Sequence, residues 1–275
     1  MNIFDLVLVQ PILNLLVAIY QGLIFLKLPG ALGFAIIVLV VIVRAISWPL
    51  TSTQLKSAAK MAELRPRLDE IKKRFGHDRT KHQEEQMRLY RSAGVNPAAG
   101  CLPLILQMPI FIGLYNVLIR VVEAATNLDK LDGLNRLLYW PALAVSGLDP
   151  TFLGVNLGLK PAAWATAGAV LLAVPVITTA LQFVQSKMMV TASPPRVAVA
   201  KEKKDELAET MQAVQSQMTY LMPAMIGFFS YTFPVGLSLY WNVFTVVGII
   251  QQYQVFGKQS LKNLTPKFLW MKLKL

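Results

Sequence analysis

The feature that most constrains this chain is an apolar run over residues 31–50, ALGFAIIVLVVIVRAISWPL, which contains one arginine, Arg44. Twenty residues of helix span roughly 30 Å, the thickness of a bilayer's hydrocarbon core. The run therefore predicts a membrane-spanning helix that carries a cation. A guanidinium at that depth costs a few kcal/mol or more, so it needs a carboxylate, water or a route to the headgroups.

The sequence offers Arg44 no acidic partner, because no other apolar run contains Asp or Glu. Two interpretations stay open. In the first, the long side chain reaches toward the headgroups, since Arg44 lies only six residues from Leu50, which is roughly 9 Å of helix. In the second, the guanidinium is unpartnered, faces a wet, half-open cavity and awaits an anion from another molecule.

Composition places this run in a polytopic membrane protein. The chain is 55% hydrophobic and 15% charged, with a mean hydropathy of +0.49, which is too apolar for a soluble domain of this length. Its Lys and Arg residues fall 21 on one side of the predicted membrane and 5 on the other. By the positive-inside rule, the N-terminus is then outside, the C-terminus is cytoplasmic and the number of spans is odd.

Residues that support covalent chemistry are scarce. A single cysteine, Cys101, allows neither an intramolecular disulfide nor a cysteine metal site, and His77 and His82 lie in a polar loop where solvation is the simpler interpretation. We find no phosphate-binding glycine loop, nucleophile elbow or pair of carboxylates at membrane depth. The sequence predicts no catalytic residue, no metal and no cofactor, so we expect a protein that is not an enzyme.

Hydropathy and helix breakers divide the chain into ten segments. They are 1–30, an external amphipathic interfacial helix, with an additional span as the open alternative; 31–52, span 1; 53–95, a cytoplasmic helical hairpin; 96–122, span 2; 123–160, an external loop; 161–185, span 3; 186–216, a cytoplasmic loop; 217–233, span 4; 236–254, span 5; and 255–275, a basic cytoplasmic tail. Five spans satisfy the odd-number requirement.

Prolines and aromatic residues add detail to this plan. Pro66 is expected to kink the first helix of the hairpin, and Pro175 to lie in the middle of span 3. A short interfacial helix is expected over residues 134–143, anchored by Tyr139 and Trp140. The lysine-rich tail can bind anionic lipid or, through the same phosphate electrostatics, ribosomal RNA.

Three motifs carry a resemblance to a known family. They are Arg44 followed by Pro49-Leu50-Thr51; Asn96-Pro97 through Gly100-Cys101-Leu102-Pro103 to Gln107-Met108-Pro109; and Phe233-Pro234-Val235-Gly236-Leu237 with Leu239-Tyr240-Trp241. With the order of the spans and the charged hairpin, they make the chain similar to the YidC/Oxa/Albino family of membrane-protein insertases, in the bacterial five-span form without the large external domain.

The resemblance implies an all-α polytopic membrane protein in which five transmembrane helices surround a hydrophilic groove, with a cytoplasmic helical hairpin and an N-terminal interfacial helix. It also implies a substrate groove lined by Arg44, Gln107, Gln185 and Trp241. The implied activity moves short hydrophilic segments of nascent membrane proteins across the bilayer through a cytoplasm-open groove, releases their apolar helices into lipid, and assists folding beside the general secretion channel.

The resemblance implies partners and a location as well. Nascent membrane proteins, the Sec translocon, the ribosome and anionic lipids are the expected partners, DNA is not, and a monomer is the expected functional form. The absence of an evident transit peptide favours a bacterial plasma membrane. Two other classes stay open: a small-molecule or anion transporter that uses the buried arginine, and an interaction scaffold.

Overall fold

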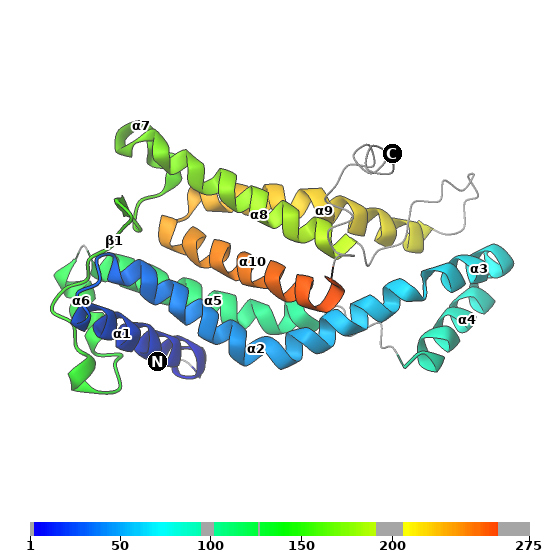
Figure 1. Ribbon diagram of the computed structural model, residues 1–275, viewed down its shortest axis with the longest axis horizontal. Helices are drawn as coiled ribbons and strands as arrows, with labels where there is room; N and C mark the ends of the chain where they lie inside the picture. The colour runs from blue at the N-terminus through cyan, green and yellow to red at the C-terminus, as the bar shows by residue number, and fades with distance from the viewer. Residues whose placement is uncertain (1–2, 95–101, 126, 191–205, 258–275) are drawn as a thin grey trace. The chain divides into compact units, whose positions relative to one another are not determined.

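The computed structural model describes residues 3–94, 102–125, 127–190 and 206–257, which are almost entirely helical (Figure 1). These residues divide into two compact units, each assembled from three segments of the chain. The first unit comprises Met1–Ser47, Leu104–Gln182 and Ala224–Val247. The second comprises Trp48–Pro103, Phe183–Pro223 and Gly248–Leu275.

The first unit contains the apolar core. Its long helical segments belong to η1 (Asp5–Val9), α1 (Gln10–Phe25), α2 (Ala31–Glu63), α5 (Leu102–Ala124), α8 (Ala173–Val190), α9 (Glu206–Thr232) and α10 (Val235–Phe256), and the last five extend beyond the unit. Fully buried leucines from four helices, Leu13, Leu39, Leu114 and Leu237, meet in one cluster. Close van der Waals packing of these side chains helps to hold α1, α2, α5 and α10 together, because lipid is as apolar as leucine and gives no hydrophobic driving force between helices.

Helix α1 turns its polar side chains toward the protein. Asn14, only 4% exposed, donates to the Leu137 carbonyl and accepts from the Tyr139 amide at 2.7 Å, and Gln21 donates to the Ala144 carbonyl. The outward face is apolar, and Val7 and Leu15 lie on it. The predicted amphipathic helix is present, but its polar face lies against residues 137–144 of the connection to α8.

The connection between α5 and α8 is more structured than predicted. It contains α6 (Leu128–Asn135), the 3-10 turn η3 (Pro141–Leu143) and a two-stranded hairpin, β1 (Thr151–Phe152) and β2 (Val155–Asn156). The helix expected over residues 134–143 therefore begins and ends earlier. Tyr139 and Trp140 follow it and are largely exposed, as interfacial anchors would be.

The β1–β2 hairpin ties the beginnings of two long helices together. The Phe152 ring packs edge-on against Phe34 of α2, with centroids 5.2 Å apart. Just beyond the hairpin, the carbonyls of Leu157 and Leu159 each accept a hydrogen bond of 2.8 Å, from the Gly236 and Val235 amides respectively. The first amides of a helix lack partners within it, so these bonds satisfy the N-terminus of α10.

The first part of the predicted third span does not form one regular helix. Residues 161–172 form the short turns η4 (Pro161–Ala163), α7 (Trp164–Ala167) and η5 (Ala169–Leu172), and Gly168 separates the last two with φ +108°. The regular helix α8 begins at Ala173, so Pro175 lies in its first turn rather than mid-helix. A first-turn proline sacrifices no helical hydrogen bond, which explains why α8 is not broken there.

The other predicted spans correspond to long helices. Span 1 lies within α2, span 2 is covered from Leu102 onward by α5, and spans 4 and 5 fall within α9 and α10. Among the described residues, three helices are long and apolar enough to cross a membrane: Asp5–Phe25, Ala31–Met61 and Ala169–Met189. The first of these is the segment for which the sequence left an additional span open, so its placement stays a prediction.

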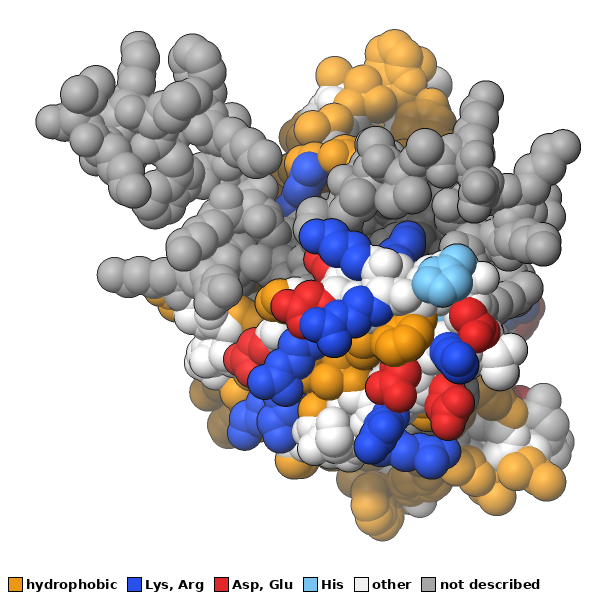
Figure 2. Space-filling model, turned by 90° about the vertical axis from the view of Figure 1, so that its right-hand side faces the viewer, with side chains coloured by type: hydrophobic (Ala, Val, Ile, Leu, Met, Phe, Trp, Pro, Cys, Tyr) orange, Lys and Arg blue, Asp and Glu red, His pale blue; other side chains and the backbone are white. Residues whose placement is uncertain are grey.

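The second unit contains a charged hairpin of α3 (Arg65–Phe75) and α4 (Arg79–Ser92). The chain breaks between α2 and α3 at Leu64, and Pro66 occupies the first turn of α3, so the kink expected at Pro66 is present as a helix start. The side chain of Asp78 caps α4 by accepting from the Lys81 amide. Figure 2 shows basic and acidic side chains interspersed around a small hydrophobic area on this face.

Candidate functional site

Arg44 lies on α2 and points at the middle of α10, within the first unit. Its Nη2 donates a hydrogen bond of 2.7 Å to the main-chain carbonyl of Phe244. Its guanidinium carbon also lies 3.4 Å from the centroid of the Phe244 ring. Only 7% of Arg44 is exposed. Phe244 therefore gives the cation both a backbone contact and an aromatic contact.

These contacts bear on both interpretations of Arg44. The side chain does not reach toward the headgroups, because Phe244 is nine residues from the start of α10 and twelve from its end. Nor is the guanidinium unpartnered. A hydrogen bond to a charged group contributes about 1.5–3 kcal/mol, and a desolvated cation–π contact contributes up to about 2 kcal/mol. Together they offset much of the cost of a buried cation.

An aromatic cluster extends from Phe244 along α10 toward α5. The ring centroids of Tyr240 and Phe244 are 5.8 Å apart, and Phe111 of α5 lies 5.1 Å from Trp241 and 6.4 Å from Tyr240. Separations of three and four residues bring Tyr240, Trp241 and Phe244 onto one side of α10. The structure thus brings the predicted Trp241 into the same cluster as the residue that holds Arg44.

Gln107 is placed by its backbone alone. It lies on α5, four residues before Phe111. Its side chain lies outside the part of the structure that is described.

Two glutamines near the end of α8 fall in different units. Gln185 lies on α8 within the second unit, and its side chain is half-buried. Gln182 belongs to the first unit, where its Oε1 accepts from the Thr245 hydroxyl at 3.4 Å. Since Thr245 follows Phe244 directly, Gln182 is the amide of α8 that reaches the neighbourhood of Arg44's partner. The sequence names both glutamines near the end of this span, but nothing in it ranks them.

Phe244 and Phe111 were missed by the sequence analysis. The available signal was spacing: Phe244 follows Trp241 by three residues, and Phe111 follows Gln107 by four, so each shares a helix face with a residue the analysis had named. Apolar aromatic residues in a span are common, however, and spacing alone does not mark these two.

The described residues contain no cluster of side chains that could bind a metal ion. Across residues 3–94, 102–125, 127–190 and 206–257, no group of three His, Cys, Asp or Glu side chains comes close enough to hold an ion. The buried polar groups described near α8, α9 and α10 of the first unit are mostly hydroxyls and amides. Such groups solvate or recognise polar segments, and they do not activate them for covalent chemistry.

The whole arrangement matches a known family. A sequence model described as the 60Kd inner membrane protein matches residues 24–262, which is most of the chain. The chain belongs to this family. It is 38% identical to the "Inner membrane ALBINO3-like protein 1, chloroplastic" of Chlamydomonas reinhardtii over 85% of its own length and 46% of that protein. It is 34% identical to the "Membrane protein insertase YidC" of Dechloromonas aromatica, over 83% of its own length and 33% of that protein.

Structural similarity agrees with the sequence match. A crystal structure of an active YidC insertase with its first transmembrane domain resolved is similar with a TM-score of 0.55 and 26% identity, over 92% of this chain and 47% of that one. The predicted class, a helical multi-pass membrane protein of the insertase family, is therefore confirmed. The chain spans between a third and about half of the length of these relatives.

Proposed function

We propose that this chain is a membrane protein insertase that moves short hydrophilic segments of nascent membrane proteins across the bilayer. Family membership supports the class of activity. The observation that carries the proposal is the position of Arg44, a buried cation held by a carbonyl and a ring near the middle of α10. The carbonyl and the ring carry no net charge, so neither of these two contacts neutralises the guanidinium.

The proposed mechanism exchanges neutral partners for charged ones. A substrate carboxylate entering a cytoplasm-open groove attracts Arg44 more strongly than a carbonyl does, because charge-charge attraction grows as water is excluded. Gln107, Gln185 and Trp241 are proposed to line this groove with Arg44. Their amides and indole give the moving segment hydrogen-bond partners that replace water, which lowers the desolvation cost of the crossing.

Release into lipid is proposed to need no nucleotide. The apolar helix of the substrate gains about 25 cal/mol for each Å² of surface that leaves water, and this gain drives the step. Exposed apolar residues of the first unit, Met108 and Ile112 on α5 and Phe228 on α9, offer a surface along which such a helix can move. The process is binding and release, without covalent chemistry.

Topology and location follow from the same proposal. The excess of Lys and Arg on one side places the N-terminus outside and the C-terminus in the cytoplasm, in a bacterial plasma membrane. The similarity to chloroplast proteins makes a thylakoid membrane the other setting in which such a chain works. The Sec translocon, the ribosome and anionic lipids are proposed partners of a functional monomer.

The test is insertion of a single-span substrate with an acidic external tail into proteoliposomes that contain the purified chain. Arg44→Ala should slow insertion about tenfold or more, as expected for loss of one charge-assisted contact, and Arg44→Lys should stay close to wild type. A substrate whose tail acids are replaced by amides should be indifferent to both changes. Arg136→Ala, an exposed arginine of the same unit, is the matched control.

The result that overturns the proposal is equal insertion by Arg44→Ala and wild type on every acidic-tailed substrate. The same liposomes also test the transporter class. Flux of a small anion that depends on Arg44, without insertion of any substrate, would assign the arginine to solute transport instead.

A further inference from the structure

Arg44 takes its backbone and ring contacts from the same residue. The Phe244 carbonyl accepts from Nη2 at 2.7 Å, and the Phe244 ring lies 3.4 Å from the guanidinium carbon. A carbonyl within an α-helix is fixed by its backbone, and the ring is flanked by Tyr240 one turn away. Since the carbonyl is fixed by the helix and the ring packs beside Tyr240, we expect the two contacts to break when Arg44 swings away.

We propose that Phe244 is a latch that holds Arg44 at rest and releases it only to a negatively charged segment. This inference rests on the proposed function, in which Arg44 engages carboxylates of the substrate. It adds a specificity-determining residue to that function. The latch keeps a lone cation from drawing stray anions or headgroups into the membrane, and it sets how strong an attraction must be to release the guanidinium.

The chemistry of the two contacts explains the selectivity. A neutral polar segment offers Arg44 hydrogen bonds no better than the one from the Phe244 carbonyl, so exchange brings no gain and costs the ring contact. A carboxylate offers two charged oxygens, which outweigh both contacts at once. The latch therefore filters acidic from neutral segments, and its strength is set by the ring, because the carbonyl is common to every residue.

The ring is removed by Phe244→Leu, which keeps an apolar side chain and the backbone carbonyl. This variant should raise insertion of an acidic-tailed substrate about three- to tenfold, the range expected when one cation–π contact no longer favours the resting state. A neutral-tailed substrate should be unaffected. Phe244→Tyr keeps the ring and should match wild type, as should Phe229→Leu, a half-buried phenylalanine of α9 in the same unit.

In the Arg44→Ala background, Phe244→Leu should have no effect, because the latch then has nothing to hold. If Arg44→Ala slows insertion while Phe244→Leu leaves it unchanged, the latch is overturned. The latch is also overturned if Phe244→Leu slows insertion as much as Arg44→Ala does. The ring would then hold Arg44 in its active position instead of restraining it. Thermal unfolding of every variant identifies any change that is merely loss of structure.

A second measurement separates the latch from the proposed function. Phenylglyoxal modifies arginine side chains, and mass spectrometry of the peptide that contains Arg44 gives the rate at that residue in the detergent-solubilised chain. Phe244→Leu should accelerate this reaction about three- to tenfold, in line with the insertion result. An unchanged rate overturns the latch. Acceleration with no effect of Arg44→Ala on insertion leaves the latch standing and removes the insertase role of Arg44.

Discussion

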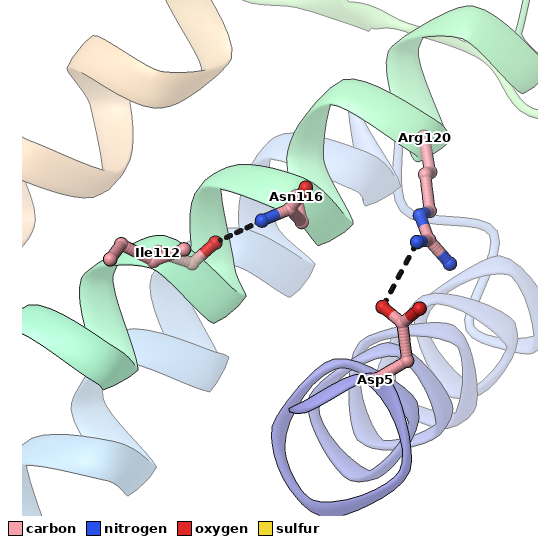
Figure 3. Close-up of polar contacts among 4 residues, drawn as sticks. All are labelled: Asp5, Ile112, Asn116 and Arg120. Carbon is pink, nitrogen blue, oxygen red and sulfur yellow. Dashed lines mark hydrogen bonds and ion pairs between the residues drawn. The ribbon is translucent and has the colours of Figure 1, made fainter. Parts of the chain in front are cut away.

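Asp5 and Arg120 join the N-terminal helix to α5 through an ion pair, with Arg120 Nη2 3.0 Å from Asp5 Oδ1 (Figure 3). The side chains are 20% and 34% exposed, so the pair is only partly screened by water. Asp5→Asn removes the charge at nearly constant volume. We expect a loss of about 0.5–1 kcal/mol in the free energy of unfolding, at the upper end for an accessible pair.

Unfolding in detergent at low and high salt checks this prediction, because screening should shrink the difference between the variant and wild type. The exchanged pair, Asp5→Arg with Arg120→Asp, should recover part of the loss. Asp132→Asn, an exposed acid on α6, is the matched control and should change little. Equal losses at both salt concentrations would show that Asp5 acts through packing rather than charge.

Gly33 of α2 is predicted to tolerate no side chain. A Cβ at this position would lie 2.1 Å from the Phe152 ring, which closes over the helix from the β1–β2 hairpin. Gly33→Ala should therefore destabilise the protein by about 1–3 kcal/mol, the usual range for overpacking. Gly22→Ala is the matched control, because this glycine of α1 has open space around it and alanine favours helix.

A variant of the contacting residue, Phe152→Ala, tests whether overpacking is the cause of the Gly33→Ala loss. Phe152→Ala alone should destabilise the protein by loss of burial, but it should also remove most of the added cost of Gly33→Ala. Additive losses in the double variant, measured by chemical unfolding, would mean that Gly33 is required for backbone flexibility and not for close approach of the ring.

The Arg44 site was only partly predictable from the sequence. The apolar run and its lone cation were visible in twenty consecutive residues, and the surrounding helix is as predicted. Its partner, Phe244, lies 200 residues away, and hydropathy holds no information on which helices become neighbours. The absence of an acid in the spans suggested solvent, whereas the backbone carbonyl of another helix, which no sequence pattern marks, supplied the acceptor.

Local sequence patterns gave incomplete predictions where the structure depends on the neighbouring parts of the chain. The sequence correctly predicted that α1 is amphipathic, but it could not predict what the polar face contacts. Asn14 on this face forms hydrogen bonds with Leu137 and Tyr139 of the protein itself. Pro175 was expected in the middle of span 3 because the apolar run before it is continuous. The run contains Gly168, whose positive φ ends one turn and begins the next, so the helix starts later than hydropathy indicates.

Ser230 of α9 is predicted to be the central link among α8, α9 and α10. Its hydroxyl lies 3.1 Å from that of Thr178 and 2.9 Å from that of Ser238, and all three residues are at most 2% exposed. Ser230→Ala removes one partner from each of the other two hydroxyls, although Thr178 still donates to the Val174 carbonyl and Ser238 to the Ser230 carbonyl. We expect a loss of about 0.5–1.5 kcal/mol in the free energy of unfolding, the range for hydrogen bonds between helices in a membrane.

Thermal unfolding in detergent measures the loss, and Thr232→Ala is the matched control because that hydroxyl bonds only to carbonyls of its own helix. A triple variant with alanine at all three positions should be more stable than the sum of the single losses implies, because no buried hydroxyl is then left unsatisfied. Simple additivity would show that the three hydroxyls act independently.

Helix α1 is predicted to lie along the outer interface, although η1 and α1 together are long enough to cross the membrane. Its two ends contact the same region of the chain. Near one end, Asp5 pairs with Arg120, which is four residues from the end of α5, and near the other the Tyr20 hydroxyl accepts from the Asp149 amide. A spanning helix would bring its ends to opposite faces of the bilayer.

Single cysteines in a Cys101→Ser background test this placement. Ile3→Cys and Phe25→Cys, both more than 80% exposed in the isolated chain, should react with a membrane-impermeant maleimide from the outside or be protected by lipid, and neither should react from the cytoplasmic side. Met87→Cys, on α4 of the charged hairpin, is the matched control and should react only from the cytoplasmic side. Labelling of Ile3→Cys from the cytoplasmic side would make α1 a sixth span and, because an even number of spans puts both termini on one face, would move the N-terminus to the cytoplasm.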